Sequence, residues 1–210
     1  RLPGSAAIPK PWPQHFAVLL GLVLLAAFFQ PAAGLAAEAD RADIPFPIIE
    51  RFENFGQEAG IAAHKVHAVL KTTDGQLWIG TWDGLCVREE SGRFKRFGPE
   101  DGLSHKMVLS LVEDPKTGDL WVGTMRGLNR VSGGKITRYL QTDSGLPNNV
   151  VYGVDIADDT VWVATAAGTG ALGLKTGAWK IYDHNNSIMH EPWCYSIKAA
   201  KELIYIGVWG

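Results

Sequence analysis

Side chains suited to binding a polar molecule recur at intervals of about 42 residues along this 210-residue chain. They fall in two sets of short segments that alternate with apolar runs. Imidazole, amide and charged groups form hydrogen bonds with polar ligands, and indole rings stack on flat apolar surfaces. We therefore expect a site for a small polar ligand or glycan, formed by His64, Lys65, Trp82, Asp83, His105, Lys106, Met125, Arg126, Asn148, Asn149, His190, Glu191 and Trp193.

The same set offers limited means for catalysis. His64, His105, His190 and Glu191 could act as a general base or acid. The sequence has no repeated carboxylate pair, nucleophile elbow, CxxC motif or paired Cys/His spacing. We therefore assign no catalytic residue, no metal site and no cofactor, and a propeller lyase or hydrolase acting on a polysaccharide-like substrate is an alternative.

Each candidate also fits a role without a ligand. Taken alone, His64 and His105 fit solvated loop residues better than ligand contacts. The Asn148-Asn149 pair fits a turn, because asparagine tolerates positive φ. Trp82 and Trp193 fit the covering of a sheet edge equally well. Three residues at equivalent positions could line a central channel, although packing is the favoured interpretation for them: His67, Tyr152 and Tyr195.

An aromatic residue within a short apolar segment defines the repeat. The segments 77–81 and 120–124 read Leu-Trp-apolar-Gly-Thr, and 161–165 and 204–208 follow the same pattern. Asp-Gly and other glycine turns divide each unit into four short strands. Radial repetition of four-stranded antiparallel sheets builds a β-propeller. We therefore predict an all-β fold, an incomplete propeller whose repeated Trp residues pack between blades.

The predicted blades cover about residues 66–97, 108–140 and 151–182, with a half blade at 194–210 and an outer strand at 48–55. Alternate turns of a meander lie on opposite faces, so the second–third loops and the inter-blade loops share one face. That face carries all the candidate binding residues. The third residue of each first strand is small, as expected where strands converge on an axis: Ala68, Ser110, Gly153 and Ser196.

The N-terminal 37 residues have the pattern of a secretory signal peptide. Arg1 and Lys10 precede an uncharged apolar run over 16–29, and small residues follow, with cleavage expected near Ala36 or Ala37. The run is too short to span a bilayer, which takes about 20 residues. We expect an exported, periplasmic protein with a linker over 38–47 and no membrane span in the mature segment. An uncleaved anchor is the alternative.

Composition is that of an exported globular protein. The chain has 20 Lys and Arg residues against 22 Asp and Glu residues, without a basic run, so nucleic acid is not expected as a partner. Cys86 and Cys194 lie in apolar segments at different positions of their repeats. We expect two buried free thiols rather than a disulfide.

The pattern Asp-Gly-x-Leu-Trp-Ile-Gly-Thr-x2-Gly-Leu over 74–85, repeated in register over 118–128, resembles the two-component regulator propeller repeat. The third copy departs with Ala164, and the fourth departs with Tyr205 and Val208. The resemblance implies a periplasmic sensor module, often two seven-bladed propellers ahead of a membrane helix and a histidine kinase. It also implies recognition of a ligand, commonly a carbohydrate breakdown product.

Three full units and a half unit do not make the usual number of blades, so we expect a fragment of a longer protein. A small ring of about four blades is the alternative. Three hypotheses for function follow: a ligand-sensing propeller that acts with a downstream kinase region or a protein partner, a propeller enzyme, or a scaffold that binds a protein partner.

Overall fold

Short apolar segments and glycine turns build β-strands throughout the part of the chain that the structure describes. The computed structural model describes residues 53–63, 65–200 and 202–209, all within the unit Glu53–Gly210. The predicted signal peptide, linker and candidate His64 lie outside these residues. So does most of the predicted outer strand 48–55, whose described end, residues 53–55, belongs to no strand.

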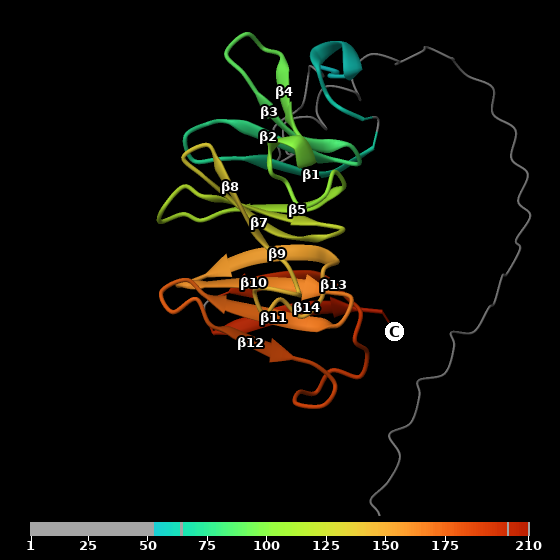
Figure 1. The fold of residues 1–210 in the computed structure, drawn as a ribbon, viewed down its shortest axis with the longest axis vertical. Helices are drawn as coiled ribbons and strands as arrows, with labels where there is room; N and C mark the ends of the chain where they lie inside the picture. The colour runs from blue at the N-terminus through green and yellow to red at the C-terminus, as the bar shows by residue number, and fades with distance from the viewer. Residues whose placement is uncertain (1–52, 64, 201, 210) are drawn as a thin grey trace, which may run out of the picture. The chain divides into compact units, whose positions relative to one another are not determined.

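Three sheets are four-stranded antiparallel meanders in chain order, and a fourth has two strands (Figure 1). Blade 1 contains β1 (Val66–Lys71), β2 (Leu77–Thr81), β3 (Gly84–Arg88) and β4 (Phe94–Phe97). Blade 2 contains β5 (Val108–Glu113), β6 (Leu120–Thr124), β7 (Gly127–Ser132) and β8 (Lys135–Tyr139). Blade 3 contains β9 (Val151–Ala157), β10 (Thr160–Thr165), β11 (Gly168–Gly173) and β12 (Trp179–Tyr182). Blade 4 contains β13 (Cys194–Ala200) and β14 (Leu203–Val208).

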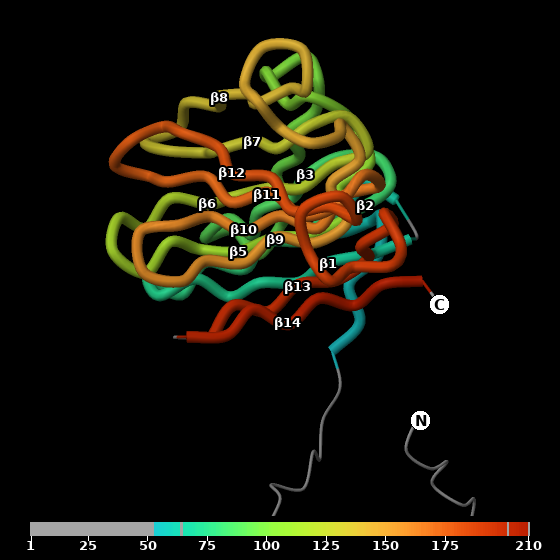
Figure 2. The backbone as a smooth tube through the Cα atoms, turned by 90° about the horizontal axis from the view of Figure 1, so that it is seen from below, coloured from blue at the N-terminus to red at the C-terminus, as the bar shows by residue number. Residues whose placement is uncertain are grey.

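The blades follow one another from β1–β4 to β13–β14, as Figure 1 shows. Their first strands are neighbours in the order β1, β5, β9, β13. Figure 2 shows the outer strands β8 and β12 on one side of the unit and β1 and β13 on the other. Two short 3-10 helices, η1 (Gln57–Ala59) and η2 (Pro99–Asp101), precede blades 1 and 2. The arrangement confirms the predicted all-β propeller fold of antiparallel blades.

Small residues allow the first two strands of each blade to approach the next blade. Ala68, Ser110, Gly153 and Ser196 pair with Gly80, Gly123, Ala164 and Gly207, respectively. A Cβ on Gly123 would lie 2.9 Å from the carbonyl oxygen of Val151 in blade 3. One on Gly153 would lie 3.2 Å from the backbone nitrogen of Ile197 in blade 4. The predicted column of small residues therefore serves close packing between blades.

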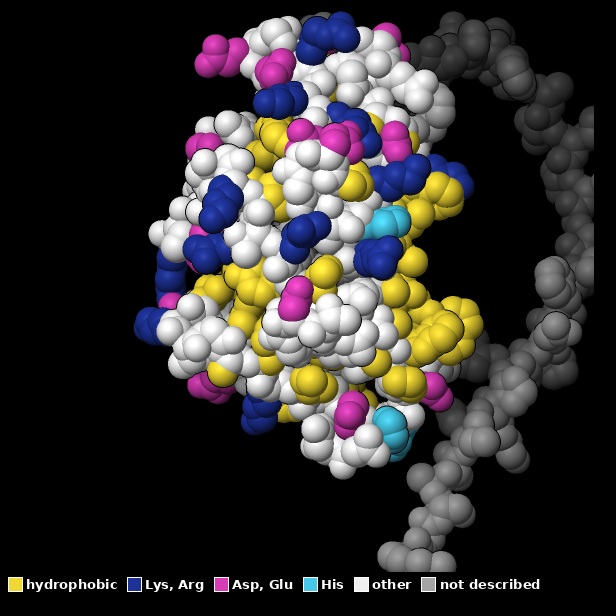
Figure 3. All heavy atoms as spheres, viewed as in Figure 1, with side chains coloured by type: hydrophobic (Ala, Val, Ile, Leu, Met, Phe, Trp, Pro, Cys, Tyr) yellow, Lys and Arg dark blue, Asp and Glu magenta, His cyan; other side chains and the backbone are white. Residues whose placement is uncertain are grey.

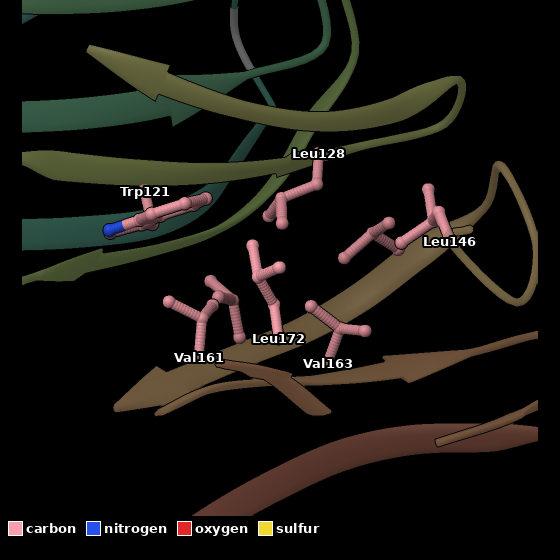
Figure 4. Packing of buried hydrophobic residues seen from close by; sticks show 8 residues of the cluster. Trp121, Leu128, Leu146, Val161, Val163 and Leu172 are labelled. Carbon is pink, nitrogen blue, oxygen red and sulfur yellow. The ribbon is translucent and has the colours of Figure 1, made fainter. Parts of the chain in front are cut away.

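The core lies mainly between blades. Leu85, Val108 and Leu120 belong to the cluster between blades 1 and 2. Between blades 2 and 3, Trp121 packs with Leu128, Leu146, Val161, Val163 and Leu172 (Figure 4).

The prediction that the repeated Trp residues pack between blades is confirmed for Trp121, which is 0% exposed, and for Trp78, which is half-buried against the cluster between blades 1 and 2. Trp162 is half-buried, and Tyr205, which departs from the repeat, is 58% exposed. Burial of this aromatic position therefore varies from one blade to the next.

A Thr-x-x-Gly turn joins the second and third strands in each of blades 1 to 3. The hydroxyls of Thr81, Thr124 and Thr165 donate to the carbonyl oxygens three residues later at 2.9, 2.8 and 2.7 Å. Each hydroxyl also accepts a backbone N–H from two residues ahead at 3.1 Å. The turn glycines have positive φ, for example 128° at Gly127, which is costly for other residues.

Both cysteines are buried and free, as predicted. Burial raises the pKa of each thiol, so both are neutral at ordinary pH. Among the described residues no helix is long and apolar enough to cross a membrane.

Candidate functional site

A β-bulge interrupts the first strand of every blade at the same position. In each pairing with the second strand, one residue is skipped: His67, Leu109, Tyr152 and Tyr195. A bulge leaves its residue outside the ladder and redirects its side chain. In each blade, therefore, one side chain of the first strand departs from the regular alternation between the two faces of the sheet.

The backbone next to each bulge is fixed by a second repeated contact. The N–H of Trp82, Met125, Ala166 and Trp209, each just after the second strand, donates to the residue that leads into the first strand. The acceptors are the carbonyl oxygens of Lys65, Met107, Val150 and Trp193, at 3.2, 3.1, 3.4 and 3.2 Å. We call these eight residues and the four bulge residues the rim. The rim lies on the face that the sequence predicted for binding.

The rim is continuous from blade to blade. The N–H of Gly127, in the turn of blade 2, donates to the Asn149 carbonyl ahead of blade 3 at 2.6 Å. Gly168 in blade 3 makes the same contact with Pro192 ahead of blade 4, also at 2.6 Å. Between blades 1 and 2, Lys106 Nζ lies 3.1 Å from Asp83 Oδ1. These links place the rim side chains of successive blades beside one another.

Blades 3 and 4 contribute an aromatic cluster centred on Tyr195. Its ring centroid lies 4.8 Å from that of Tyr152, 5.9 Å from Trp209 and 6.5 Å from Trp193. Trp193 and Trp209 are 51% and 69% exposed. Burial, and secondarily the nearby Tyr195, raises the pKa of Tyr152, so its phenol stays protonated. The cluster presents flat apolar surface and hydroxyl groups to solvent.

Blade 1 contributes a cationic group held by aromatic rings. Lys65 Nζ lies 3.7 Å from the centroid of the Trp82 ring. The Trp82 indole N–H donates to His67 Nε2, and the two rings are nearly parallel. Arg126 in the turn of blade 2 is exposed and follows Lys65 along the rim. In Figure 3 hydrophobic side chains gather at the right-hand edge, with Lys, Arg and His side chains beside them in its upper half.

Several predicted site residues instead organise the loops. His105 Nδ1 accepts the Met107 N–H at 3.0 Å. The Asn148 side chain accepts the Val150 N–H at 2.8 Å in a local turn, but neither Asn148 nor Asn149 has the positive φ that we expected there. Asn149 Oδ1 accepts the Gln141 N–H at 2.9 Å. One acceptor of each of these side chains therefore holds the local backbone of the loops ahead of blades 2 and 3.

Other residues of the predicted set lie on or beside the rim. Asp83 pairs with Lys106, Met125 is half-buried, and His190 and Glu191 are exposed ahead of blade 4.

Sequence reasoning left three important rim residues outside the predicted set. Tyr152 and Tyr195 were expected to pack rather than to contact a ligand, and Trp209 was not singled out. Their common sequence signal is position: each is equivalent to a residue of the His67–Trp82 pair in blade 1. Alignment of the repeats places Tyr152 and Tyr195 at the position of His67, and Trp209 at the position of Trp82.

A separate groove lies away from the rim. A groove of about 1270 Å³ runs between blades 1 and 2 on the face of the β1–β2 and β5–β6 turns, lined by Trp78, Phe97, Glu113, Leu120 and Ile136 among others. Its charged residues include both signs, and a smaller hollow of about 410 Å³ lies between blades 2 and 3. In the described part of the chain no group of three or more His, Cys, Asp or Glu residues could hold a metal ion.

Residues 60–83, which end at the blade 1 rim, match the family described as two component regulator propeller. The chain therefore carries a two-component regulator propeller repeat. It is also 52% identical over 40 residues to histidine kinase P4 from Formosa agariphila, a stretch covering 19% of this chain and 3% of that protein.

Solved structures share the fold. The extracellular domain of the hybrid two component system BT3049 from B. thetaiotaomicron superposes with a TM-score of 0.63 at 20% identity. The match covers 70% of this chain and 21% of that domain. The extracellular domain of the one component system BT4673 gives a TM-score of 0.61 at 22% identity, covering 73% and 22%. This chain thus spans about a fifth of either domain.

Proposed function

We propose that this chain is the ligand-sensing part of an exported two-component-type signalling protein, and that its rim binds a polar ligand such as a carbohydrate. The observation that carries the proposal is the repeated bulge, which brings one variable side chain per blade to a shared rim. A rigid scaffold that presents variable loops is a common basis for recognition. Sugars offer both a flat apolar face for rings and hydroxyls for polar groups.

The similar proteins support a role in an exported signalling protein. The propeller repeat matches a family named for two-component regulators, and the two solved relatives are extracellular domains of signalling systems. The leader pattern at the N-terminus favours export to the periplasm. A kinase region of the same protein, or a separate protein partner, would then receive the signal.

Binding of oligosaccharides to the mature chain tests the proposal. We expect some members of a neutral and acidic oligosaccharide panel to bind in calorimetry and to raise the melting temperature. Tyr195→Leu should weaken binding about 2- to 10-fold by removing the central stacking ring. Tyr205→Leu, at an exposed tyrosine of β14 away from the rim, is the matched control. A panel that binds equally to both variants, or does not bind, would contradict the proposal.

A further inference from the structure

The rim has two chemically different halves. Four of the six rim residues of blades 3 and 4 are aromatic, namely Tyr152, Trp193, Tyr195 and Trp209. The rim of blade 1 contains Lys65 beside Trp82 and His67, and Lys106 and Arg126 lie next to the rim in the loops of blades 1 and 2. This division has no counterpart in the repeat pattern, which is shared by all blades. The propeller fold does not require this uneven distribution of basic and aromatic side chains, so we attribute it to the ligand that the rim contacts.

The positive charge on the basic half is only partly neutralised. Lys106 is paired with Asp83 at 3.1 Å, and Asp83 also lies 3.9 Å from Arg96 Nε. Within residues 53–63, 65–200 and 202–209, no ion pair with a carboxylate is formed by Lys65 or Arg126. Among the described residues, Asp83 therefore neutralises Lys106 in part, whereas the charges of Lys65 and Arg126 have no carboxylate partner.

Lys65 is also held in place before any ligand arrives. Its ammonium lies over the Trp82 ring, and that ring is fixed by the His67 acceptor and by the backbone bond to Lys65 itself. A cation over an aromatic face keeps its N–H donors free for another acceptor. Holding the side chain in one position lowers the entropy lost on binding an anion.

We infer that the ligand of the rim is an acidic oligosaccharide, whose sugar rings stack on the Tyr195 cluster while a carboxylate or sulfate meets Lys65 and Arg126. The inference rests on the proposed function and narrows its ligand class. Lys65 belongs to blade 1 and Tyr195 to blade 4. An oligomer that follows the rim from blade to blade would contact both.

Matched pairs of ligands separate charge from sugar recognition. The probes are oligogalacturonate and its methyl ester, alginate oligosaccharides and their esters, and sulfated and desulfated galactan oligosaccharides. We expect at least one charged member to bind the mature chain about tenfold more tightly than its neutral counterpart. That preference should shrink as salt is raised, since exposed charges are screened.

Two lysine variants locate the preference. Lys65→Gln should reduce affinity for the charged ligand about tenfold and leave the neutral counterpart unchanged. Lys95→Gln is the control, because Lys95 also lies over an aromatic ring of blade 1, Phe97 at 5.1 Å, but on β4 away from the rim. The control should bind both ligands as the unaltered chain does.

The outcomes distinguish this inference from the proposed function. Binding of neutral oligosaccharides that depends on Tyr195 and not on Lys65 would overturn the acidic ligand and leave sugar sensing standing. Binding of charged ligands that is equally reduced by Lys65→Gln and Lys95→Gln would overturn the inference as a general charge effect. Failure of every charged probe to bind at millimolar concentration would also overturn it.

Discussion

The two faces of the blades are tied together by different chemistry. On the face of the β1–β2 and β5–β6 turns, neighbouring blades are joined by side chains: Glu113 accepts the N–H and hydroxyl of Thr73 at 2.8 and 2.7 Å. Asp159 binds both Lys116 and Lys175, at 2.7 and 2.6 Å. On the rim the joining contacts run mostly through the backbone. On the turn face, polar side chains bond neighbouring blades together. On and beside the rim, Lys65, Arg126 and four aromatic rings remain available to bind a ligand.

The largest effect is expected from a buried ion pair beside the turn face. Asp119 is 6% exposed and accepts from Arg130 Nε at 2.8 Å. Asp119→Ala should lower the free energy of unfolding by about 2–3 kcal/mol, because it removes hydrogen bonds to a buried charge. Urea denaturation followed by circular dichroism measures the change. Glu90→Ala, at an exposed residue, should shift it by no more than about 0.5 kcal/mol.

The pH dependence of stability provides a second test of the Asp119–Arg130 ion pair. Burial alone would raise the pKa of Asp119, but hydrogen bonds from Ser132, Arg130 and Thr117 outweigh it and lower the pKa below its usual value. The stabilisation is therefore present above the unfolded-state pKa of about 3.9 and is lost as pH falls below it. Equal loss from Asp119→Ala at pH 7 and pH 2 would contradict an ionised pair.

The second-largest loss of stability is expected from the Thr124 hydroxyl, which holds the rim turn of blade 2. Thr124 is fully buried and bonds Gly127 and Arg126 through one oxygen. Thr124→Val should cost about 1–2 kcal/mol, because a buried carbonyl and N–H lose their partner. Thr137→Val on exposed β8 is the control in the same denaturation assay. An unchanged midpoint for Thr124→Val would show that the rim loops do not depend on this turn.

Much of the fold was predictable because local chemistry is repeated. Glycine turns and the Leu-Trp-apolar-Gly-Thr segment give the strand positions, and the small residue at Ala68 and its equivalents predicts close approach. Packing between blades was predicted for the repeated Trp residues; burial is complete for Trp121 and partial for Trp78 and Trp162. Burial of that position depends on the next blade, which the segment itself does not encode.

The site was harder to predict than the fold. Loop residues such as His105 and Asn148 have suitable side chains, but both are bonded to nearby backbone. Tyr152 and Tyr195 look like ordinary strand residues in the sequence. Only the register shift in the pairing reveals that they leave the ladder. A bulge is defined by the pairing of two strands, so it cannot be predicted from the sequence of one strand alone.

A smaller effect is expected at the exposed ion pairs of the turn face. Hydrogen bonds from Lys116 and Lys175 lower the pKa of Asp159 to about 2. Its contribution to stability is thus fully present above about pH 3.9, the unfolded value, and is lost as pH falls through about 2. Asp159→Asn should lower the melting temperature slightly at pH 6 in low salt and have a much smaller effect at pH 2. A difference that persists in high salt would contradict an exposed, screened pair.

The smallest effect on stability should come from the rim aromatics, and this result would sharpen the contrast most. Trp193 is 51% exposed, touches Tyr195 edge-on and joins Trp209 through its backbone carbonyl, which alanine retains. Trp193→Ala should therefore change the free energy of unfolding by no more than about 0.5 kcal/mol, as measured by urea denaturation with circular dichroism. A loss above about 1 kcal/mol would mean that the ring packs a blade edge. The aromatic side chains of the rim would then stabilise the fold, as the polar side chains of the turn face do, and would not be available to bind a ligand.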